Sequence, residues 1–335
     1  MKTCNQTMAT PVAGRFHRTL ARLMCTVAAV TLLVVTAGPA FADKEPAPDA
    51  DPAIKQTMYA SPELAAQALT DALDTEDREA LKKMFGEKYA DLLPLDPIGR
   101  ENVDKYLALY AEQHELIPED EQEFMLAIGK NYWTFPVPIV EGDRGWHFDT
   151  DAGIEQVRIR QIGRDELATI QASLAYYDAQ VEYAEQDRNG DGVLEYAQKF
   201  LSTPGEHDGL YWETQPGETE SPLGPLFADN DLPDGAYHGY HYRILTSQGK
   251  NAPGGAYNYV IGGRMIAGFA LIAWPAEYGE TGIMSFMVSH EGVVYQKDLG
   301  PESATEAEAM SSFDPGPGWV PVPETDDTPA GAGQG

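Results

Sequence analysis

The side chains best suited to chemistry in this chain lie together in one short acidic loop. Oxygen-bearing side chains stand at positions 1, 3, 5 and 9 of a calcium-loop pattern, namely Asp187, Asn189, Asp191 and Glu195. Gly192 holds position 6, where the chain must turn sharply, and Val193 at position 7 offers its backbone carbonyl. Because Ca²⁺ prefers oxygen ligands, this spacing predicts a calcium site in the loop.

The predicted calcium site differs from a full EF-hand loop in one respect. Position 12 is Gln198, where the EF-hand has a bidentate Glu. We therefore expect weak affinity, with a dissociation constant on the order of 10⁻⁴–10⁻³ M, and a structural role in which the ion joins the preceding helix to the following segment. The alternative is an Asx-rich turn that ends the helix without a metal ion.

A second set of reactive residue types lies in the loop-rich region 201–242. Residues typical of hydrolytic sites occur there, namely Ser202, His207, Asp208, His238 and His241. Nearness in sequence does not establish triad geometry, and no G-x-S-x-G motif is present. His238 and His241 could bind a metal ion together only in a loop, because residues three apart on a strand face opposite sides. An envelope hydrolase with its site in 201–242 is therefore the alternative, and a protein without catalytic activity is the favoured interpretation.

Aromatic residues gather around glycine-rich turns in the second half of the chain. They are Tyr211, Trp212, Tyr237, Tyr240, Tyr242, Tyr257, Tyr259 and Trp274. Such side chains can line a groove for a glycan or a peptide. Since alternation along strands would bury half of them, the favoured interpretation is that they fill the core of a sheet.

The first 42 residues have the composition of an export signal. Basic residues and no acidic ones precede an apolar run at 23–36, which is followed by Ala40-Phe41-Ala42. We expect cleavage after Ala42 and a periplasmic or secreted protein. The apolar run is shorter than the roughly 20 residues that span a bilayer, so no stable membrane insertion is expected after cleavage. Both cysteines lie in this segment, so the exported chain has no thiol.

The chain is strongly acidic, with 53 Asp and Glu against 23 Lys and Arg and a net charge of −30. Four of the basic residues and none of the acidic ones lie in residues 1–42, so cleavage changes the net charge to −34. A surface of this charge repels phosphate backbones and excludes nucleic-acid binding. It also attracts divalent cations, although an acidic surface is equally a general property of proteins suited to an envelope or an external medium.

The hydrophobic pattern predicts an α+β protein with two domains. A disordered lead at 43–60 is expected before the first domain, 61–162. Helices are expected from Ser61-Pro62-Glu63 to 72, at 76–85 and at 102–113, and strands at 124–128, 132–140 and 144–149. Helices followed by a small, bent antiparallel sheet resemble the cone-shaped nuclear-transport-factor-like fold, an analogy of architecture alone.

The second predicted domain, 163–313, begins with a long helix. A helical connector at 152–161 is expected to end near Gly163, and the long helix then runs over 165–186 into the calcium-type loop. An antiparallel meander follows, with strands at 240–246, 256–261, 265–274, 282–289 and 293–297. A short helix is expected at 303–310, and a disordered tail at 314–335. A long helix before such a sheet is weakly similar to pilin-like domains.

Several ordered motifs run through the chain from about Tyr59 to Trp319. They include Trp146-His-Phe-Asp149, the run 187–200, Asp208-Gly-Leu-Tyr-Trp212, Ser221-Pro-Leu-Gly-Pro-Leu226, Gly254-Gly-Ala-Tyr257 and Val294-Tyr-Gln-Lys-Asp-Leu-Gly300. Together they resemble the bacterial domain-of-unknown-function family 2950. The resemblance implies an exported bacterial protein and supplies no activity, cofactor or catalytic residue. We therefore expect a non-catalytic binding or structural module of the cell envelope, whose partner is an envelope protein, a peptide or a glycan.

Overall fold

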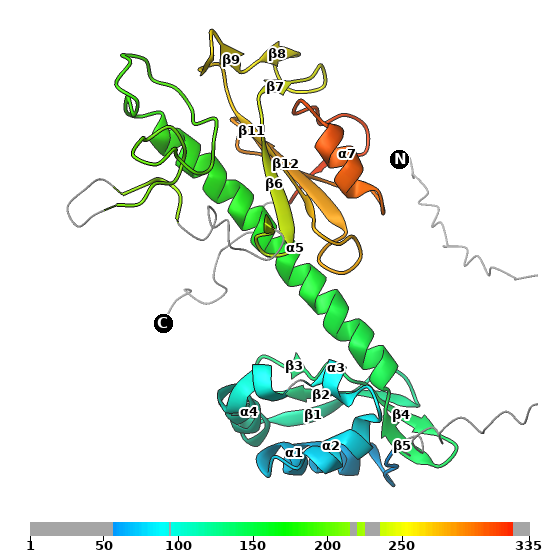
Figure 1. The fold of residues 1–335 in the computed structure, drawn as a ribbon. Coiled ribbons are helices and arrows are strands. Elements are labelled where there is room, and N and C mark those ends of the chain that lie inside the picture. Colours follow the sequence, from blue (N-terminus) through cyan, green and yellow to red (C-terminus); the bar gives the residue numbers. More distant parts are fainter. Residues whose placement is uncertain (1–55, 94, 215–219, 225–234, 324–335) are drawn as a thin grey trace, which may run out of the picture. The chain divides into compact units, whose positions relative to one another are not determined.

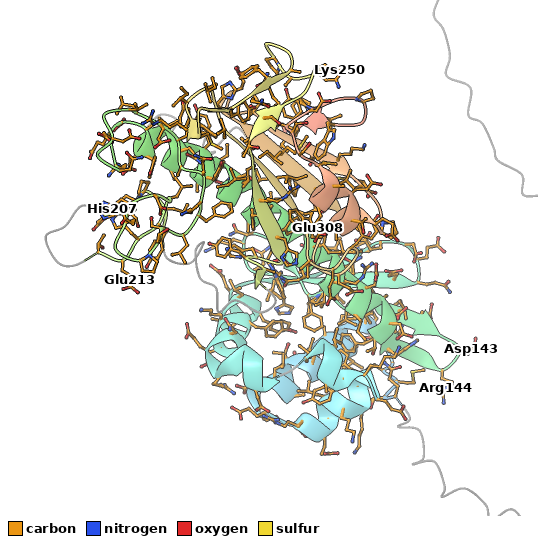
Figure 2. All side chains as sticks on the ribbon, turned by 45° about the horizontal axis from the view of Figure 1, so that its top comes forward. Asp143, Arg144, His207, Glu213, Lys250 and Glu308 are labelled. Atoms are coloured by element: carbon orange, nitrogen blue, oxygen red, sulfur yellow. The ribbon has the colours of Figure 1, made fainter. Side chains whose placement is uncertain are left out.

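A computed structural model describes residues 56–93, 95–214, 220–224 and 235–323 of the chain (Figure 1). The predicted export signal and most of the predicted lead lie outside these residues, as do parts of the 201–242 region and the end of the predicted tail. The described residues form helices and antiparallel sheets, which confirms the predicted α+β class. Figure 2 shows the side chains, with Asp143 and Arg144 marking one hairpin turn.

Helices open the first half of the fold. They are α1 (Pro62–Asp74), α2 (Arg78–Phe85), α3 (Tyr89–Leu92) and α4 (Leu95–Glu112). The first begins as predicted, because the Ser61 side chain accepts a hydrogen bond from the N–H of Leu64 and a proline occupies the first turn. The second ends at Gly86, whose φ of 76° favours glycine. Gly99 has a φ of 74° and interrupts α4 near its start.

A small antiparallel sheet follows these helices. Its strands are β1 (His114–Pro118), β2 (Glu123–Ile128), β3 (Trp133–Thr134), β4 (Ile139–Gly142) and β5 (Gly145–Phe148). The order is β1-β2-β4-β5, and β3 pairs with β2. The sequence pattern does not predict β1, and the strand expected at 132–140 is two short strands. Pro136 and Pro138 lie between them, where a residue without an N–H cannot extend a ladder.

One apolar core joins α1, α2 and α4 to this sheet. Its most buried side chains include Leu69, Leu81, Leu126, Ile139 and Phe148, each with no exposed surface. Burial of such side chains contributes roughly 1.5–3 kcal/mol each to folding. The core therefore holds the helices against the sheet without any disulfide.

The helix α5 (Thr150–Tyr183) is one continuous element of 34 residues. The predicted break near Gly163 does not occur, and the expected connector and long helix are a single helix. Glycine in a helix interior costs only about 1 kcal/mol, which is too little to end a helix whose two halves are packed. Ile154 and Val157 in the first half contact the core described above, whereas Tyr176 and Ala179 in the second half belong to another core.

The second sheet contains β6 (Tyr240–Leu245), β11 (Ala270–Pro275), β12 (Met284–Ser289), β13 (Val294–Asp298) and β14 (Val320–Pro321). It is antiparallel in the order β14-β13-β12-β11-β6, so part of the predicted tail extends its edge. Short pairs at its margin are formed by β7 (Ser247–Gln248), β8 (Tyr257–Asn258), β9 (Val260–Ile261) and β10 (Arg264–Met265). The strand expected at 265–274 is divided between β10 and β11 at Gly268.

The second sheet is covered on both faces. Tyr242 on β6 donates to Thr169 on α5, and the next residue, Arg243, donates at 2.6 Å to the carbonyl of Ala307 on α7 (Ser303–Ala309). Successive strand residues point to opposite faces, so α5 and α7 lie on opposite faces of this sheet. All six residues of β11 are buried as a result.

The described residues thus form two apolar cores. The buried residues of one lie before residue 150 and those of the other between 176 and 313, and side chains of α5 pack against the first and belong to the second. The domain boundaries at 61–162 and 163–313 stay a prediction. In the described part of the chain, no helix combines the length and apolar character required of a membrane span.

Candidate functional site

The acidic loop begins where α5 ends, and Asp187 organises its first turn. One carboxylate oxygen of Asp187 accepts hydrogen bonds from the N–H groups of Gly190 at 2.8 Å and Asp191 at 3.1 Å. The other accepts from the N–H of Gly192 at 2.8 Å. Gly190 and Gly192 have φ values of 73° and 85°, which a Cβ would disfavour. The turn glycine therefore performs the role that the sequence pattern assigns to it.

The remaining predicted ligand residues continue the same turn. Asn189 Oδ1 accepts from the N–H of Asp191 at 3.1 Å, and Asp191 Oδ1 accepts from the N–H of Val193 at 3.0 Å. The amide Nδ2 of Asn189 donates to Glu195 Oε1 at 2.6 Å. All five predicted ligand residues therefore lie in one connected, mostly exposed loop.

Arg264 on β10 contacts the acidic loop, and the sequence analysis did not identify it. Its Nε and Nη2 both lie 2.8 Å from Asp191 Oδ2. The hydrogen bond from Arg264 holds the pKa of Asp191 below its ordinary value. Arg264 is 73 positions away in sequence, and no local pattern marks it. The guanidinium therefore supplies a positive charge to the loop from a different part of the fold.

The loop oxygens match the chemistry of Ca²⁺, but they make other contacts in this arrangement. Both oxygens of Asp187 accept backbone hydrogen bonds, and one oxygen of Asp191 contacts Arg264. Among the described residues, no group of three or more His, Cys, Asp or Glu side chains is arranged to hold a metal ion. An ion bound by these side chains would therefore have to share or displace the hydrogen bonds and the contact between Asp191 and Arg264.

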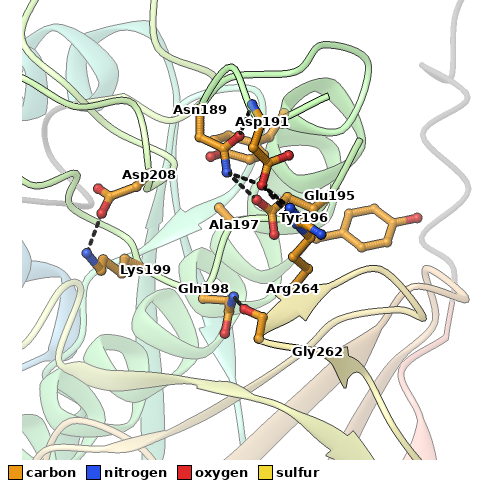
Figure 3. Close-up of a pocket in the computed structure, with 12 residues that line it drawn as sticks. Asn189, Asp191, Glu195, Tyr196, Ala197, Gln198, Lys199, Asp208, Gly262 and Arg264 are labelled. Atoms are coloured by element: carbon orange, nitrogen blue, oxygen red, sulfur yellow. Dashed lines mark hydrogen bonds and ion pairs between the residues drawn. The ribbon is translucent and has the colours of Figure 1, made fainter. Parts of the chain in front are cut away.

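A polar cavity of about 480 Å³ opens beside the loop (Figure 3). Its lining combines Asp191 and Arg264 with Lys199 and Asp208, which form a second ion pair. Burial raises the pKa of Asp208, but hydrogen bonds from Lys199 and Thr203 outweigh this effect and lower it overall. The cavity is thus lined by paired charges of both signs, which suits a hydrated ion or a polar group better than an apolar ligand.

Tyr183, at the end of α5, also lines this cavity. Its hydroxyl donates at 2.7 Å to the backbone carbonyl of His207. Burial, reinforced by the negative charges of Glu195 and Asp208, raises the pKa of Tyr183 to about 12. The hydroxyl is therefore protonated at neutral pH and holds the 201–212 segment against the helix.

The residues that suggested a hydrolase make contacts that do not form a triad. The Ser202 hydroxyl is buried and exchanges hydrogen bonds with the backbone of Gly209 at 3.0 and 3.2 Å. His207 stacks on Trp212 with ring centroids 4.4 Å apart, while Asp208 binds Lys199 and Thr203. In the part of the region that the structure describes, no hydrogen bond links these three residues. The hydrolase alternative stays a prediction.

The other two candidate histidines lie beside different aromatic rings. His238 has a φ of 50° and its ring centroid is 4.2 Å from that of Tyr237. The ring of His241 lies 5.7 Å from that of Trp274. Each histidine therefore has a local packing partner of its own.

The aromatic residues of the second half are largely core residues. Tyr240 and Tyr259 have no exposed surface, and Trp212 and Trp274 are 6% exposed. Burial raises the pKa of both buried tyrosines well above the ordinary value. Their burial agrees with a packing role, whereas Tyr257 is 36% exposed at the sheet margin.

Comparison with known proteins identifies a family but no relative of known activity. A family model described as "Protein of unknown function (DUF2950)" matches residues 56–322. Neither a curated protein nor a solved structure matches the chain.

Proposed function

The chain belongs to the DUF2950 family, and from this premise we propose that it is an exported cell-envelope protein that binds a partner or supports a structure rather than catalysing a reaction. The observation that carries the proposal is the loop at 187–195. Its side chains fold the end of α5 back toward β10 through a network of hydrogen bonds and one ion pair. A loop of this kind fixes the relative position of two elements, which is a structural role.

The proposed ligand of the loop is a weakly bound Ca²⁺ ion. Its ligands would be the side-chain oxygens of Asp187, Asn189, Asp191 and Glu195 and the backbone carbonyl of Val193. Carboxylate, amide and carbonyl oxygens are the ligand types that Ca²⁺ takes in proteins. Gln198 stands where a bidentate Glu would strengthen binding, and Arg264 already contacts Asp191, so the dissociation constant should lie on the order of 10⁻⁴–10⁻³ M.

The proposed place of action follows from the N-terminal segment and the charge. Removal of residues 1–42 would release a periplasmic or secreted protein of net charge −34, without stable membrane insertion. Concentrations of Ca²⁺ outside cells are high enough to occupy a weak site. A partner protein, a peptide or a glycan of the envelope fits this setting, whereas a nucleic acid does not.

Thermal unfolding in millimolar Ca²⁺ and in chelator tests the proposal. At a Ca²⁺ concentration ten times the dissociation constant, binding should stabilise the native protein by about 1.4 kcal/mol, which raises the midpoint by roughly 2–4 °C. Asp191→Ala should abolish the rise. Asp208→Ala is the matched control, because Asp208 is an ion-paired carboxylate of the same cavity outside the loop. An equal midpoint with and without Ca²⁺ would contradict the proposed ion site.

A further inference from the structure

The first half of the fold contains an apolar groove that the acidic loop does not explain. Its volume is about 770 Å³, within the roughly 300–1,000 Å³ that small-molecule sites occupy. The buried side chains of Val103, Tyr106 and Phe135 line it, and the more exposed Leu109 and Trp133 also face it. Leu109 is 39% and Trp133 is 47% exposed, so the groove presents apolar surface to the solvent.

The charges along this groove are opposite to the charge of the whole chain. Lys105 and Arg164 line it, and no described Asp or Glu does. Arg160, one turn before Arg164 on α5, donates to the Thr134 carbonyl at 2.6 Å and lies 5.9 Å from the ring of Trp133. Neither arginine has an ion-pair partner in the described part of the chain, although Arg164 Nη2 donates to Gln161 Oε1 at 2.6 Å. The whole protein has 53 acidic residues, so a groove lined by cations and by no described carboxylate differs in charge from the rest of the chain.

Trp133 is held in place at the groove by its surroundings. Tyr132 before it has a φ of 52°, an uncommon conformation for a residue other than glycine, in a turn closed by its N–H to the carbonyl of Gly129 at 3.0 Å. The Trp133 ring meets Phe135 edge-on at 6.5 Å. This turn and the contact with Phe135 place the exposed indole at the groove.

We propose that this groove binds a long-chain carboxylate, with its hydrocarbon chain against Val103, Tyr106 and Phe135 and its anionic head at Arg164. An apolar lining of this size takes up a hydrocarbon chain, and a guanidinium recognises a carboxylate through two parallel N–H donors. Lys105 adds positive charge, although it is also paired with Glu101 at 2.9 Å. The inference goes beyond the proposed function, since none of these residues belongs to the calcium-type loop.

Titration of oleate into protein purified from cells that express the full chain tests the inference. Oleate should bind saturably with one molecule per chain, and oleyl alcohol, which has the same chain and no charge, should bind at least tenfold more weakly. Each methylene removed from the ligand should weaken binding about fourfold, because its burial is lost. Absence of saturable binding, or equal binding of the alcohol, would overturn the inference.

Matched variants distinguish oleate binding in the groove from general hydrophobic adsorption. Leu109→Glu should weaken oleate binding at least tenfold. Arg164→Gln removes an exposed guanidinium and should weaken it by up to about fivefold. Leu64→Glu and Arg144→Gln change exposed residues that do not line the groove and should leave binding unchanged. Equal binding by all four variants would show adsorption instead of a site.

The same samples test whether a second copy of the chain covers the groove. They also separate the ligand proposal from the proposed calcium site. If a concentration-dependent dimer forms and Leu109→Glu abolishes it without any oleate effect, the groove is covered by a second copy and the ligand proposal is wrong. Circular dichroism and thermal unfolding of each variant establish that it is folded. Oleate binding should be the same in Ca²⁺ and in chelator, so failure of the ion site would leave this result unaffected.

Discussion

The loop at 187–195 and the groove lined by α4 and β3 differ in how far their side chains already have partners within the protein. In the loop, almost every carboxylate and amide already has a protein partner, from the N–H groups on Asp187 to Arg264 on Asp191. In the groove, exposed apolar surface at Leu109 and Trp133 has no cover among the described residues, and the nearby arginines lack carboxylate partners. A ligand of the loop would therefore have to share or displace existing polar contacts, whereas a ligand of the groove would cover exposed apolar surface.

This difference sets the expected strength of binding at the two places. An ion at the loop would gain Coulomb energy but would have to share or displace the contact between Asp191 and Arg264, 2.8 Å apart. An amphiphile in the groove would cover apolar surface that is otherwise hydrated, which is favourable, while its charged head would lose part of its hydration. The two proposals therefore predict weaker binding at the loop than in the groove.

The largest expected effect tests whether the two apolar cores act independently. Phe148→Ala and Phe286→Ala each remove a fully buried ring, one from each core, and each should destabilise its core by about 3–5 kcal/mol. Hydrogen exchange should accelerate in 62–148 for the first variant and in 240–298 for the second. Equal acceleration in both regions by either variant would contradict the predicted division into two domains.

A smaller effect tests the continuity of α5. A Cβ at Gly153 would lie 2.8–2.9 Å from the methyl groups of Val137, so Gly153→Ala should destabilise the protein by about 1–3 kcal/mol. A Cβ at Gly163 would meet nothing within 4 Å, so Gly163→Ala should stabilise it by about 0.5–1 kcal/mol. Urea unfolding measures both changes. A destabilising Gly163→Ala would favour the break in the helix that the sequence pattern predicts.

Removal of the competing guanidinium should sharpen the contrast between the loop and the groove. Arg264→Gln leaves Asp191 free to face the ion, and we expect Ca²⁺ affinity to rise by up to about fivefold, the range of an exposed ion pair. Lys199→Gln breaks the other ion pair of the cavity and is the control. Calorimetric titration measures the affinities. A fall in affinity for Arg264→Gln would mean that Arg264 positions the loop instead of competing with the ion.

The smallest expected effect is a pH dependence of the ion-free protein. Arg264 holds the pKa of Asp191 below its ordinary 3.8. A carboxylate whose pKa is lower in the folded state stabilises that state above its unfolded pKa, and this contribution is lost as the pH falls below about 4. Arg264→Gln should remove this part of the acid sensitivity, measured as the difference in unfolding midpoint between pH 6 and pH 3. An unchanged difference would show that the pair does not affect stability.

Local signals in the sequence predicted local structure well. Ser61-Pro62 begins α1, Gly86 ends α2, and the glycine at position 6 of the loop turns the chain as expected. Each of these signals acts through backbone conformation within a few residues. The α+β class followed from the same helical and strand periodicities.

What the sequence did not predict depends on residues that meet through the fold. Arg264 reaches Asp191 across 73 positions, and the groove combines side chains of α3, α4, β2, β3 and α5. Gly163 looked like a helix end, but packing of both halves of α5 outweighs its low helix propensity. The strand β1 has only two partly buried apolar residues, Leu116 and Ile117, too few for a periodic signal.

The central claim, that the loop is a weak calcium site, is tested most directly by calorimetric titration of Ca²⁺ into the protein and into Asp187→Ala. Asp187 is the residue whose two oxygens organise the turn. The account predicts one site per chain with a dissociation constant on the order of 10⁻⁴–10⁻³ M, lost in the variant. Absence of binding, or a site that Asp187→Ala leaves unchanged, would contradict it.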